Sequence, residues 1–595
     1  MTIINHPNLH HMLNHAVNAS PNTLAYRWFD KGNTQQQRTW REFYTEVSAV
    51  SKSLIALAIQ KNDKVCILSN TSYHWALCDL GLVSIGAVTV GIYQSNLAKE
   101  CEYIIKHSDA VLVFVENEEQ LDKLLPIKHA LPQVRKVILM HGKHNDNWVM
   151  PFEDFLALGT SVDEAHLQKM QTALNQEDIA SIVYTSGTTG IPKGALLSHG
   201  NFIFVTQSVL ACVDVRPGDS TLLFLPLAHV FARAILYAGL YANTLTYFNR
   251  NLENLLQDFK ESRPHWFASV PRIYEKVYAK VQSTAEAKAG VTLKIFRWAS
   301  AVGEQASLAR EAKQALPFSL KVQQKIARKL VFGKVHAALG GRLRWCISGA
   351  APMNPAIARF FDGAGIAILE GIGMTENTSF SNINRPNNYR IGTVGQAGPG
   401  IEIKIASDGE FLVRGPNVMA GYYKMPDETA RTIDAQGWLQ TGDLARIDDE
   451  GFVTITGRKK DLIITSGGKN IAPTTIESLL TLSKYIHQAC VIGDKQKYLV
   501  ALITLDKETV RDYCQAQGLA FDTLDRLAEN PAVLALIKNE IALCNQQLAS
   551  FESVKKFAIV PEFSLENGLL TPTLKIRRPL VLEKYAEKIA ALYYE

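Results

Sequence analysis

The stretch YTSGTTGIPKG, residues 184–194, holds three glycines, a proline, a lysine and five hydroxyl side chains. It follows the apolar run Asp178–Val183, which predicts a buried strand. A glycine-rich turn leaving a strand points successive backbone N–H groups into one concavity, and hydroxyl groups and a lysine complete an anion site. The stretch therefore predicts a phosphate-binding loop rather than a mobile surface loop.

The loop does not have the spacing of a P-loop NTPase. That class requires glycine, four residues, glycine-lysine and then serine or threonine. Counted from Gly187, the second glycine position holds Pro192 and the hydroxyl position holds Gly194. The loop thus predicts phosphate binding of another class.

Length and charge limit the classes of protein. A chain of 595 residues is expected to form more than one domain. Its net charge of +5 does not indicate a nucleic-acid partner. The charge is uneven, because residues 272–334 carry thirteen Lys or Arg and four Glu.

Cysteine usage and apolar runs predict the compartment. The eight cysteines form no C-x-x-C pair, which favours a reducing cytoplasm and neither a disulfide framework nor a zinc site. Met1–Ser20 lacks the basic and apolar regions of a secretory signal, and Leu80–Tyr93 is too short to span a bilayer. We expect a cytoplasmic protein, soluble or peripheral at the inner face of the membrane.

The pattern of apolar runs predicts an α/β fold. Short runs such as Lys64–Ser69 and Ala110–Val115 alternate with helical stretches, as expected for strands buried on both faces. Residues 438–458 read as two strands joined at an Asp-Glu-Gly turn, and a charged break follows. We expect a large N-terminal domain of layered α/β sheets over 1–457, a hinge at 458–461 and a small α+β domain over 462–595.

Six further segments occur in order along the chain with the loop. They are LPLAH at Leu225–His229, ISGAAP at Ile347–Pro352, GIGMTE at Gly371–Glu376, TGD at Thr441–Asp443, Arg458, and LTPTLKIRR at Leu570–Arg578. Together they resemble the motifs of the adenylate-forming (AMP-binding) superfamily, which includes acyl-CoA synthetases, luciferases and the adenylation domains of peptide synthetases. The resemblance implies a small β-barrel in the large domain and a mobile C-terminal domain.

The resemblance implies that a carboxylate attacks the α-phosphorus of ATP and releases pyrophosphate. Mg²⁺, which prefers oxygen ligands, would bind Thr185 and Glu376. The catalytic residues implied are Lys575, His229, Glu376 and Lys193. The residues implied to bind ATP or AMP are Thr185, Ser186, Gly187, Thr188, Thr189, Gly190, Lys193, Gly349, Ala350, Ala351, Glu370, Gly371, Ile372, Gly373, Met374, Thr375, Asp443, Arg458 and Lys575.

A second half-reaction is implied as well. In such enzymes the C-terminal domain rotates about the junction, withdraws the lysine and admits the thiol of CoA. Lys460 matches the hinge position. The turn implied to line the CoA channel is Ser466, Gly467, Gly468 and Lys469.

The acid implied is a long-chain fatty acid. The lysine in Thr-Pro-Thr-Leu-Lys, the LPLAHVFAR segment at Leu225–Arg233 and the insertion at 272–334 resemble long-chain acyl-CoA synthetases. In the insertion, Val322, Ile326 and Leu330 form an apolar stripe, and the other face carries Lys321, Lys325, Arg328 and Lys329. Such a helix fits an anionic membrane or an ordinary solvated surface.

Two residues depart from the family pattern. Ile372 replaces the usual aromatic residue under adenine, which predicts weaker nucleotide binding. Arg233 replaces a gating tryptophan found in some bacterial long-chain enzymes, so that gate is not expected here. Two alternatives stay open: a fatty acyl-AMP ligase that loads a carrier protein, and a non-catalytic acyl-adenylate-binding protein. Acyl-chain length and oligomeric state do not follow from the sequence.

Overall fold

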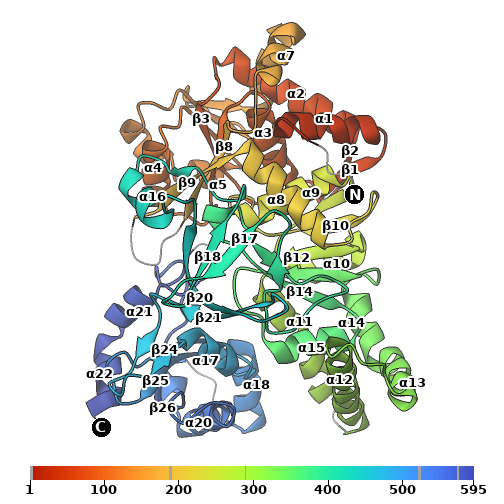
Figure 1. Cartoon of the computed structure of the whole chain (residues 1–595). Coiled ribbons are helices and arrows are strands. Elements are labelled where there is room, and N and C mark those ends of the chain that lie inside the picture. Colours follow the sequence, from red (N-terminus) through yellow and green to blue (C-terminus); the bar gives the residue numbers. More distant parts are fainter. Residues whose placement is uncertain (1–4, 186–190, 288–289, 520–523, 572–574, 595) are drawn as a thin grey trace.

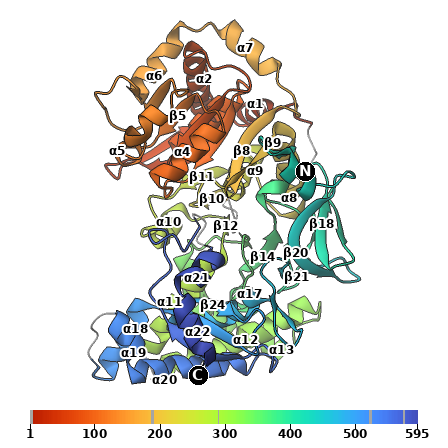
Figure 2. The same ribbon diagram turned by 90° about the vertical axis from the view of Figure 1, so that its left-hand side faces the viewer.

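The computed structural model describes residues 5–185, 191–287, 290–519, 524–571 and 575–594. The chain forms a large α/β part, red to green in Figure 1, and a smaller C-terminal part, blue, beside it (Figures 1 and 2). The α/β prediction is therefore confirmed. The predicted loop residues Ser186, Gly187, Thr188, Thr189 and Gly190 lie outside the described residues.

An eight-stranded sheet holds both ends of the predicted phosphate loop. Every residue of β4 and β5 is buried, as their continuous apolar runs predict. Strands β8 and β9 are antiparallel, with Thr185 opposite Lys193, so the loop joins two paired strands. In spatial order the strands are β19 (Gly421–Tyr422), β9 (Lys193–Ser198), β8 (Ile179–Thr185), β4 (Val88–Ile92), β3 (Lys64–Leu68), β5 (Leu112–Val115), β6 (Lys136–Leu139) and β7 (Val149–Pro151).

A nine-stranded sheet supplies most of the remaining predicted site. Its six central strands are parallel, so their carboxyl ends share one edge, where α/β proteins bind ligands. In spatial order the strands are β16 (Gln396–Ala397), β15 (Asn382–Ile383), β14 (Ala367–Ile372), β13 (Trp345–Ser348), β12 (Trp266–Ser269), β10 (Ser220–Leu223), β11 (Leu245–Phe248), β1 (Leu24–Phe29) and β2 (Gln35–Thr39).

The remaining strands form smaller sheets. The predicted small β-barrel corresponds to a four-stranded antiparallel sheet whose outer strands, β17 and β21, do not pair with each other in the described residues. Its strands are β17 (Glu402–Ile405), β18 (Glu410–Arg414), β20 (Leu439–Ile447) and β21 (Val453–Arg458). The C-terminal strands, which have a separate apolar core, are β22 (Ile463–Ile464), β23 (Asn470–Ile471), β24 (Ile486–Ile492), β25 (Leu499–Leu505) and β26 (Val554–Ile559).

Helices cover the sheets, and none that the structure describes is long and apolar enough to cross a membrane. Those of the large part are α1 (Leu9–Ala19), α2 (Trp40–Ala56), α3 (Tyr73–Val83), α4 (Ala98–His107), α5 (Glu118–Leu121), α6 (Phe152–Leu158), α7 (Glu164–Thr172), α8 (His199–Cys212), α9 (Val230–Tyr241), α10 (Leu255–Ser262), α15 (Pro355–Gly363) and α16 (Pro426–Thr432). The C-terminal helices are α17 (Pro473–Leu480), α18 (Lys507–Ala516), α19 (Leu524–Glu529), α20 (Pro531–Asn545), α21 (Arg578–Lys584) and α22 (Ala586–Tyr594).

The basic insertion is mostly helical, with a non-helical connection at residues 312–317. It consists of α11 (Pro271–Ala287), α12 (Gly290–Glu311), α13 (Phe318–Ala327), a π-helical turn at Arg328–Phe332 and α14 (Gly333–Ala338). Helix α13 lies at the outer end of this group (Figure 1). The insertion therefore adds a helical layer to the nine-stranded sheet.

A buried ion pair joins the helices that lie between the two large sheets. The Arg233 guanidinium, on α9, donates to Asp79 Oδ1 on α3 at 2.6 Å and to the hydroxyl of Ser181 on β8. Tyr237 donates to the other Asp79 oxygen at 2.6 Å. Arg233 and Asp79 are almost fully excluded from solvent. The pair thus links α3, α9 and the strand that enters the predicted phosphate loop.

We predict that Asp79→Asn destabilises the protein by about 3–5 kcal/mol, because it leaves a buried guanidinium without its counter-charge. Urea unfolding followed by tryptophan fluorescence measures the change. The matched control is Glu402→Gln, which breaks an exposed pair with Arg414 and should cost less than about 1 kcal/mol. Equal effects of the two substitutions would contradict the role of the buried pair.

Candidate functional site

His229 lies at the carboxyl edge of the nine-stranded sheet and forms the N-cap of α9. Its Nδ1 accepts from the Phe231 backbone N–H at 3.1 Å, so the ring proton is on Nε2. Burial lowers the pKa of His229 to about 4, and the nearby Lys575 ammonium acts in the same direction. The imidazole is therefore neutral at pH 7 and offers an N–H donor.

Glu376 is buried in a short 3-10 turn, Thr375–Asn377, that follows β14. Its Oε1 accepts from the Tyr422 hydroxyl at 2.6 Å. The chain after the turn runs so close to the segment before it that a Cβ on Gly373 would lie 1.9 Å from the Ser379 carbonyl oxygen. Only glycine fits there, which fixes the path of the GIGMTE segment.

Asp443 and Arg458 are cross-strand partners on β20 and β21. Arg458 Nε donates to Asp443 Oδ1 at 2.9 Å. Burial raises the pKa of Asp443, while the charges of Arg458 and Lys575 act in the opposite direction. The predicted sugar-binding carboxylate is thus held at the point where the large part ends.

Lys575 reaches this site from the C-terminal part. Thr571 N donates to Lys575 O at 2.8 Å, and Lys575 N donates to the Thr571 hydroxyl at 3.1 Å. The Lys575 side chain still reaches solvent, yet the protein around it lowers its pKa to about 8, with Arg458 acting in the same direction. The charges of Asp443 and Glu376 oppose that shift. The structure therefore brings together Lys575, His229, Glu376 and the Asp443–Arg458 pair.

Polar contacts hold the C-terminal part against the large part. Arg272 contacts His487 at 2.8 Å, Lys484 pairs with Glu286 at 2.7 Å, and Arg577 pairs with Glu100 at 3.5 Å. Lys460 is exposed in the junction. The predicted CoA-channel turn, Ser466, Gly467, Gly468 and Lys469, is exposed, and no hydrogen bond or ion pair joins it to Lys575, Asp443 or Glu376 within the described parts.

Lys193 follows the predicted phosphate loop and has two partners that sequence reasoning missed. Its ammonium pairs with the Glu428 carboxylate on α16 and lies 5.2 Å from the centre of the Tyr422 ring. Thr185 Oγ1 donates to Lys193 O at 3.4 Å. Strand β19, which contains Tyr422, pairs with the edge of β9, which begins at Lys193. This pairing brings the two partners near Lys193. The Glu428 carboxylate therefore takes the place at the Lys193 ammonium that a phosphate anion could take.

The segments predicted to contact adenine lie side by side. Gly349, Ala350, Gly371, Ile372, Gly373 and Met374 line one cavity. Ala350 adopts a left-handed backbone with φ of 69°, a conformation that concentrates at functional sites in residues other than glycine. Ala351 is exposed beside it and Thr375 is buried. Glu370, on β14, is buried, and burial raises its pKa to about 8.

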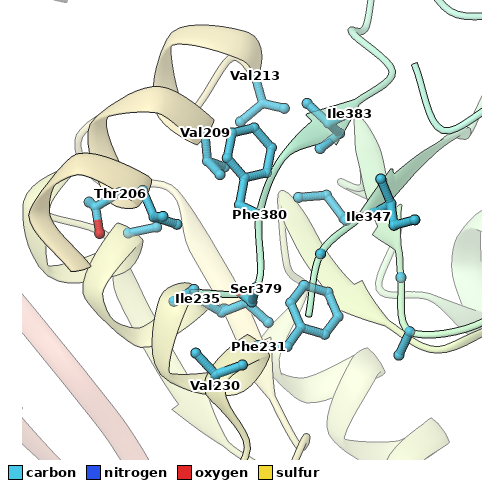
Figure 3. A pocket seen from close by; sticks show the side chains of 18 of the residues that line it. Thr206, Val209, Val213, Val230, Phe231, Ile235, Ile347, Ser379, Phe380 and Ile383 are labelled. Carbon is cyan, nitrogen blue, oxygen red and sulfur yellow. The ribbon is translucent and has the colours of Figure 1, made fainter. Parts of the chain in front are cut away.

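The same cavity continues between α8, α9 and the sheet, and it leaves about 70 Å³ for the centres of water-sized molecules (Figure 3). Its walls are apolar side chains, among them Val209, Val213, Phe231, Ile235 and Phe380. His229 also lines it. An apolar tunnel therefore starts beside the charged cluster.

Comparisons with known proteins agree with this arrangement. The model of the AMP-binding enzyme family matches residues 13–423, and that of the AMP-binding enzyme C-terminal domain matches 460–595. Long-chain-fatty-acid–CoA ligase FadD15 of Mycobacterium bovis is 36% identical over 560 residues, 93% of this chain and 92% of that protein. Human long-chain-fatty-acid–CoA ligase ACSBG2 is 31% identical over 590 residues, 93% of this chain and 88% of that protein.

Solved structures share the fold at lower identity. The adenylation domain of a carboxylate reductase from Mycobacterium chelonae has a TM-score of 0.79 at 20% identity, covering 99% of this chain and 91% of that one. Anthranilate CoA ligase AuaEII in complex with anthranoyl-AMP has a TM-score of 0.75 at 22% identity, covering 100% and 99%.

We predict that Lys575 titrates near pH 8 and that its neighbours move this titration in opposite directions. Arg458→Gln removes a cation and should raise the pKa of Lys575, whereas Asp443→Asn removes an anion and should lower it. NMR of ¹³C-methylated lysines, with Lys575→Arg to assign the signal, measures both shifts. An unchanged titration in both variants would mean that Lys575 does not dock beside this pair in solution.

Proposed function

The chain belongs to the AMP-binding enzyme family, and we propose that it is a long-chain fatty acid–CoA ligase. It activates the acid with ATP to an acyl-adenylate, and then forms acyl-CoA and AMP. Relatives named for this activity cover most of the chain. The observation that carries the proposed mechanism is the meeting of Lys575 with Glu376, Asp443 and His229 beside an apolar tunnel.

In the first half-reaction, a carboxylate oxygen bonds to the α-phosphorus of ATP and the bond to pyrophosphate breaks. Both reactants are anions, so cations must offset the charge that builds on the five-coordinate phosphorus. Lys575 would contact the acid and the α-phosphate. Lys193 would exchange Glu428 for the departing phosphates, with the loop Thr185–Gly190 around them. The neutral His229 would donate a hydrogen bond from its Nε2–H to the carboxylate of the acid.

Mg²⁺ would be held mainly by the phosphates. Glu376 fits this ion, because it is a buried carboxylate of which only Oε1 receives a hydrogen bond from the described residues. The Thr185 hydroxyl is the second proposed ligand. Mg²⁺ typically keeps several phosphate and water ligands and uses one or two protein oxygens. When bound, it neutralises phosphate charge and favours departure of pyrophosphate.

The nucleoside would lie between the remaining groups. Asp443 can accept hydrogen bonds from the ribose hydroxyls, while Arg458 holds that carboxylate in place. Ile372 would pack under adenine. The backbone on either side of Ile372 and the neighbouring loop would surround the base. The residues concerned are Gly349, Ala350, Ala351, Glu370, Gly371, Gly373, Met374 and Thr375.

In the second half-reaction, the CoA thiolate attacks the acyl carbon, and AMP leaves with the electrons of the broken C–O bond. Lys575 has to withdraw before the thiol can enter. We propose that the C-terminal domain, 462–595, rotates relative to 1–457 about residues 458–461, with Lys460 as the pivot. The turn Ser466, Gly467, Gly468 and Lys469 would then line the thiol channel.

We further propose that α13 contacts an anionic membrane, where the substrate partitions. Ala327 packs inward, whereas Phe318, Val322, Ile326 and Leu330 are exposed, with Phe318 at 83%. The cations Lys321, Lys325, Arg328 and Lys329 are exposed beside this stripe. Each cation near an anionic surface contributes about 1 kcal/mol. Apolar insertion and charge attraction would therefore both act through this helical segment.

We predict that Lys575→Ala lowers pyrophosphate release from acid and ATP by about 10²–10³. The variant should keep most of its rate when synthetic acyl-adenylate and CoA are supplied, because no charge builds on phosphorus in that step. Lys460→Pro should show the reverse bias, because proline stiffens the hinge. The control is Lys584→Ala, an exposed lysine on α21. Equal loss of both half-reactions in Lys575→Ala would refute domain alternation.

For the membrane, we predict that co-sedimentation with anionic vesicles weakens as salt rises. It should weaken further when Lys321, Lys325, Arg328 and Lys329 are changed to Gln. The control changes four exposed lysines elsewhere by the same charge: Lys99, Lys143, Lys169 and Lys260. Equal losses in the two quadruple variants, or equal binding to neutral vesicles, would count against α13 as the contact surface.

A further inference from the structure

The acyl tunnel has a direction that the sheet defines. Strands β10, β12, β13 and β14 are parallel, and His229, Gly349 and Ile372 lie at their carboxyl edge. The cavity extends from there toward the amino ends of β12 and β13. Figure 3 shows Val230 and Phe231 at one end of the cavity and Val213 at the other.

Two tryptophans lie where the cavity ends. Trp266 and Trp345 are the first residues of β12 and β13, and they are direct cross-strand neighbours. Their rings stack with centroids 5.6 Å apart and planes 20° apart. Both side chains are buried and line the cavity together with Val213 and Val215.

The segment across this end is fixed by polar contacts. Trp345 Nε1 donates to the Asp214 carbonyl oxygen at 3.3 Å. Arg344 donates to the same carbonyl at 2.8 Å and forms two hydrogen bonds to the Asp219 carboxylate. The chain from Val213 to Asp219 is therefore attached to the start of β13 at several points. This attached segment closes that end of the cavity.

The geometry points to the Trp266–Trp345 pair as the floor that limits acyl-chain length, an inference that rests on the proposed function. Trp345 and Gly349 are four residues apart along an extended segment, or about 13 Å at ~3.3 Å per residue. With carbon–carbon bonds of ~1.5 Å in a zigzag, this depth takes on the order of ten methylenes. Each methylene that fits should raise kcat/KM about fourfold, and the rise should stop where the chain meets the rings.

The experiment measures kcat/KM and binding for a series of saturated acids. The break is the chain length at which kcat/KM stops rising. Trp345→Leu and Trp266→Leu should move it to longer acids, because the smaller side chain deepens the cavity. Val213→Phe should move it to shorter acids. Trp298→Leu, a half-buried tryptophan on α12 outside the cavity, should leave the series unchanged. AMP affinity, which depends on residues at the other end, reports whether each variant is folded.

Binding of the acids is measured by displacement of a fluorescent fatty acid, which needs no turnover. An unchanged break in all floor variants that still bind AMP would overturn the assignment. A wild-type protein that binds the series with the expected break but forms no acyl-CoA would leave the floor supported and refute the proposed function. Shifts of opposite sign for the Trp and Val213 variants would support the floor.

Discussion

The proposed reaction depends on the positive charge of Lys575, and the residues around this lysine set that charge. The surrounding protein and Arg458 lower its pKa to about 8, while Asp443 and Glu376 act against the shift. The ammonium therefore stays mostly protonated at neutral pH. The same two carboxylates are the proposed ribose and Mg²⁺ ligands. The charges of Lys575, Asp443 and Glu376 thus connect the proposed nucleotide site, the proposed metal site and the position of the C-terminal domain.

Arg233, at the position of the tryptophan gate on α9, does not line the cavity. Residues 230, 231, 234, 235 and 238 of this helix line the tunnel. Arg233 and Tyr237 are one helical turn apart on another face, where they meet Asp79. The Arg233 guanidinium therefore binds Asp79 on α3 and Ser181 on β8, away from the tunnel. Chain-length control then falls to the other wall, where the strands of the nine-stranded sheet begin.

Much of the fold and part of the site could be predicted from the sequence. Continuous apolar runs predicted strands such as β3 and β5, and the Asp-Glu-Gly turn predicted the β20–β21 pair, because these signals are local. The resemblance to the adenylate-forming family implied that Lys575 and Asp443 belong to one site. Glu428, Tyr422 and the two tryptophans were missed, because their roles come from pairing between segments far apart in sequence. No local pattern encodes such register.

The contacts that dock the C-terminal domain are polar and partly exposed, as at Lys484–Glu286 and Arg577–Glu100. Each such pair contributes about 0–1 kcal/mol, far less than the separate apolar core of that domain. This difference supports the proposal that the domain undocks as a unit without unfolding. In the proposed reaction, ATP adds negative charge opposite Lys575 and favours docking. Departure of pyrophosphate removes part of that charge, so chemistry itself would weaken the docked state just when the thiol has to enter.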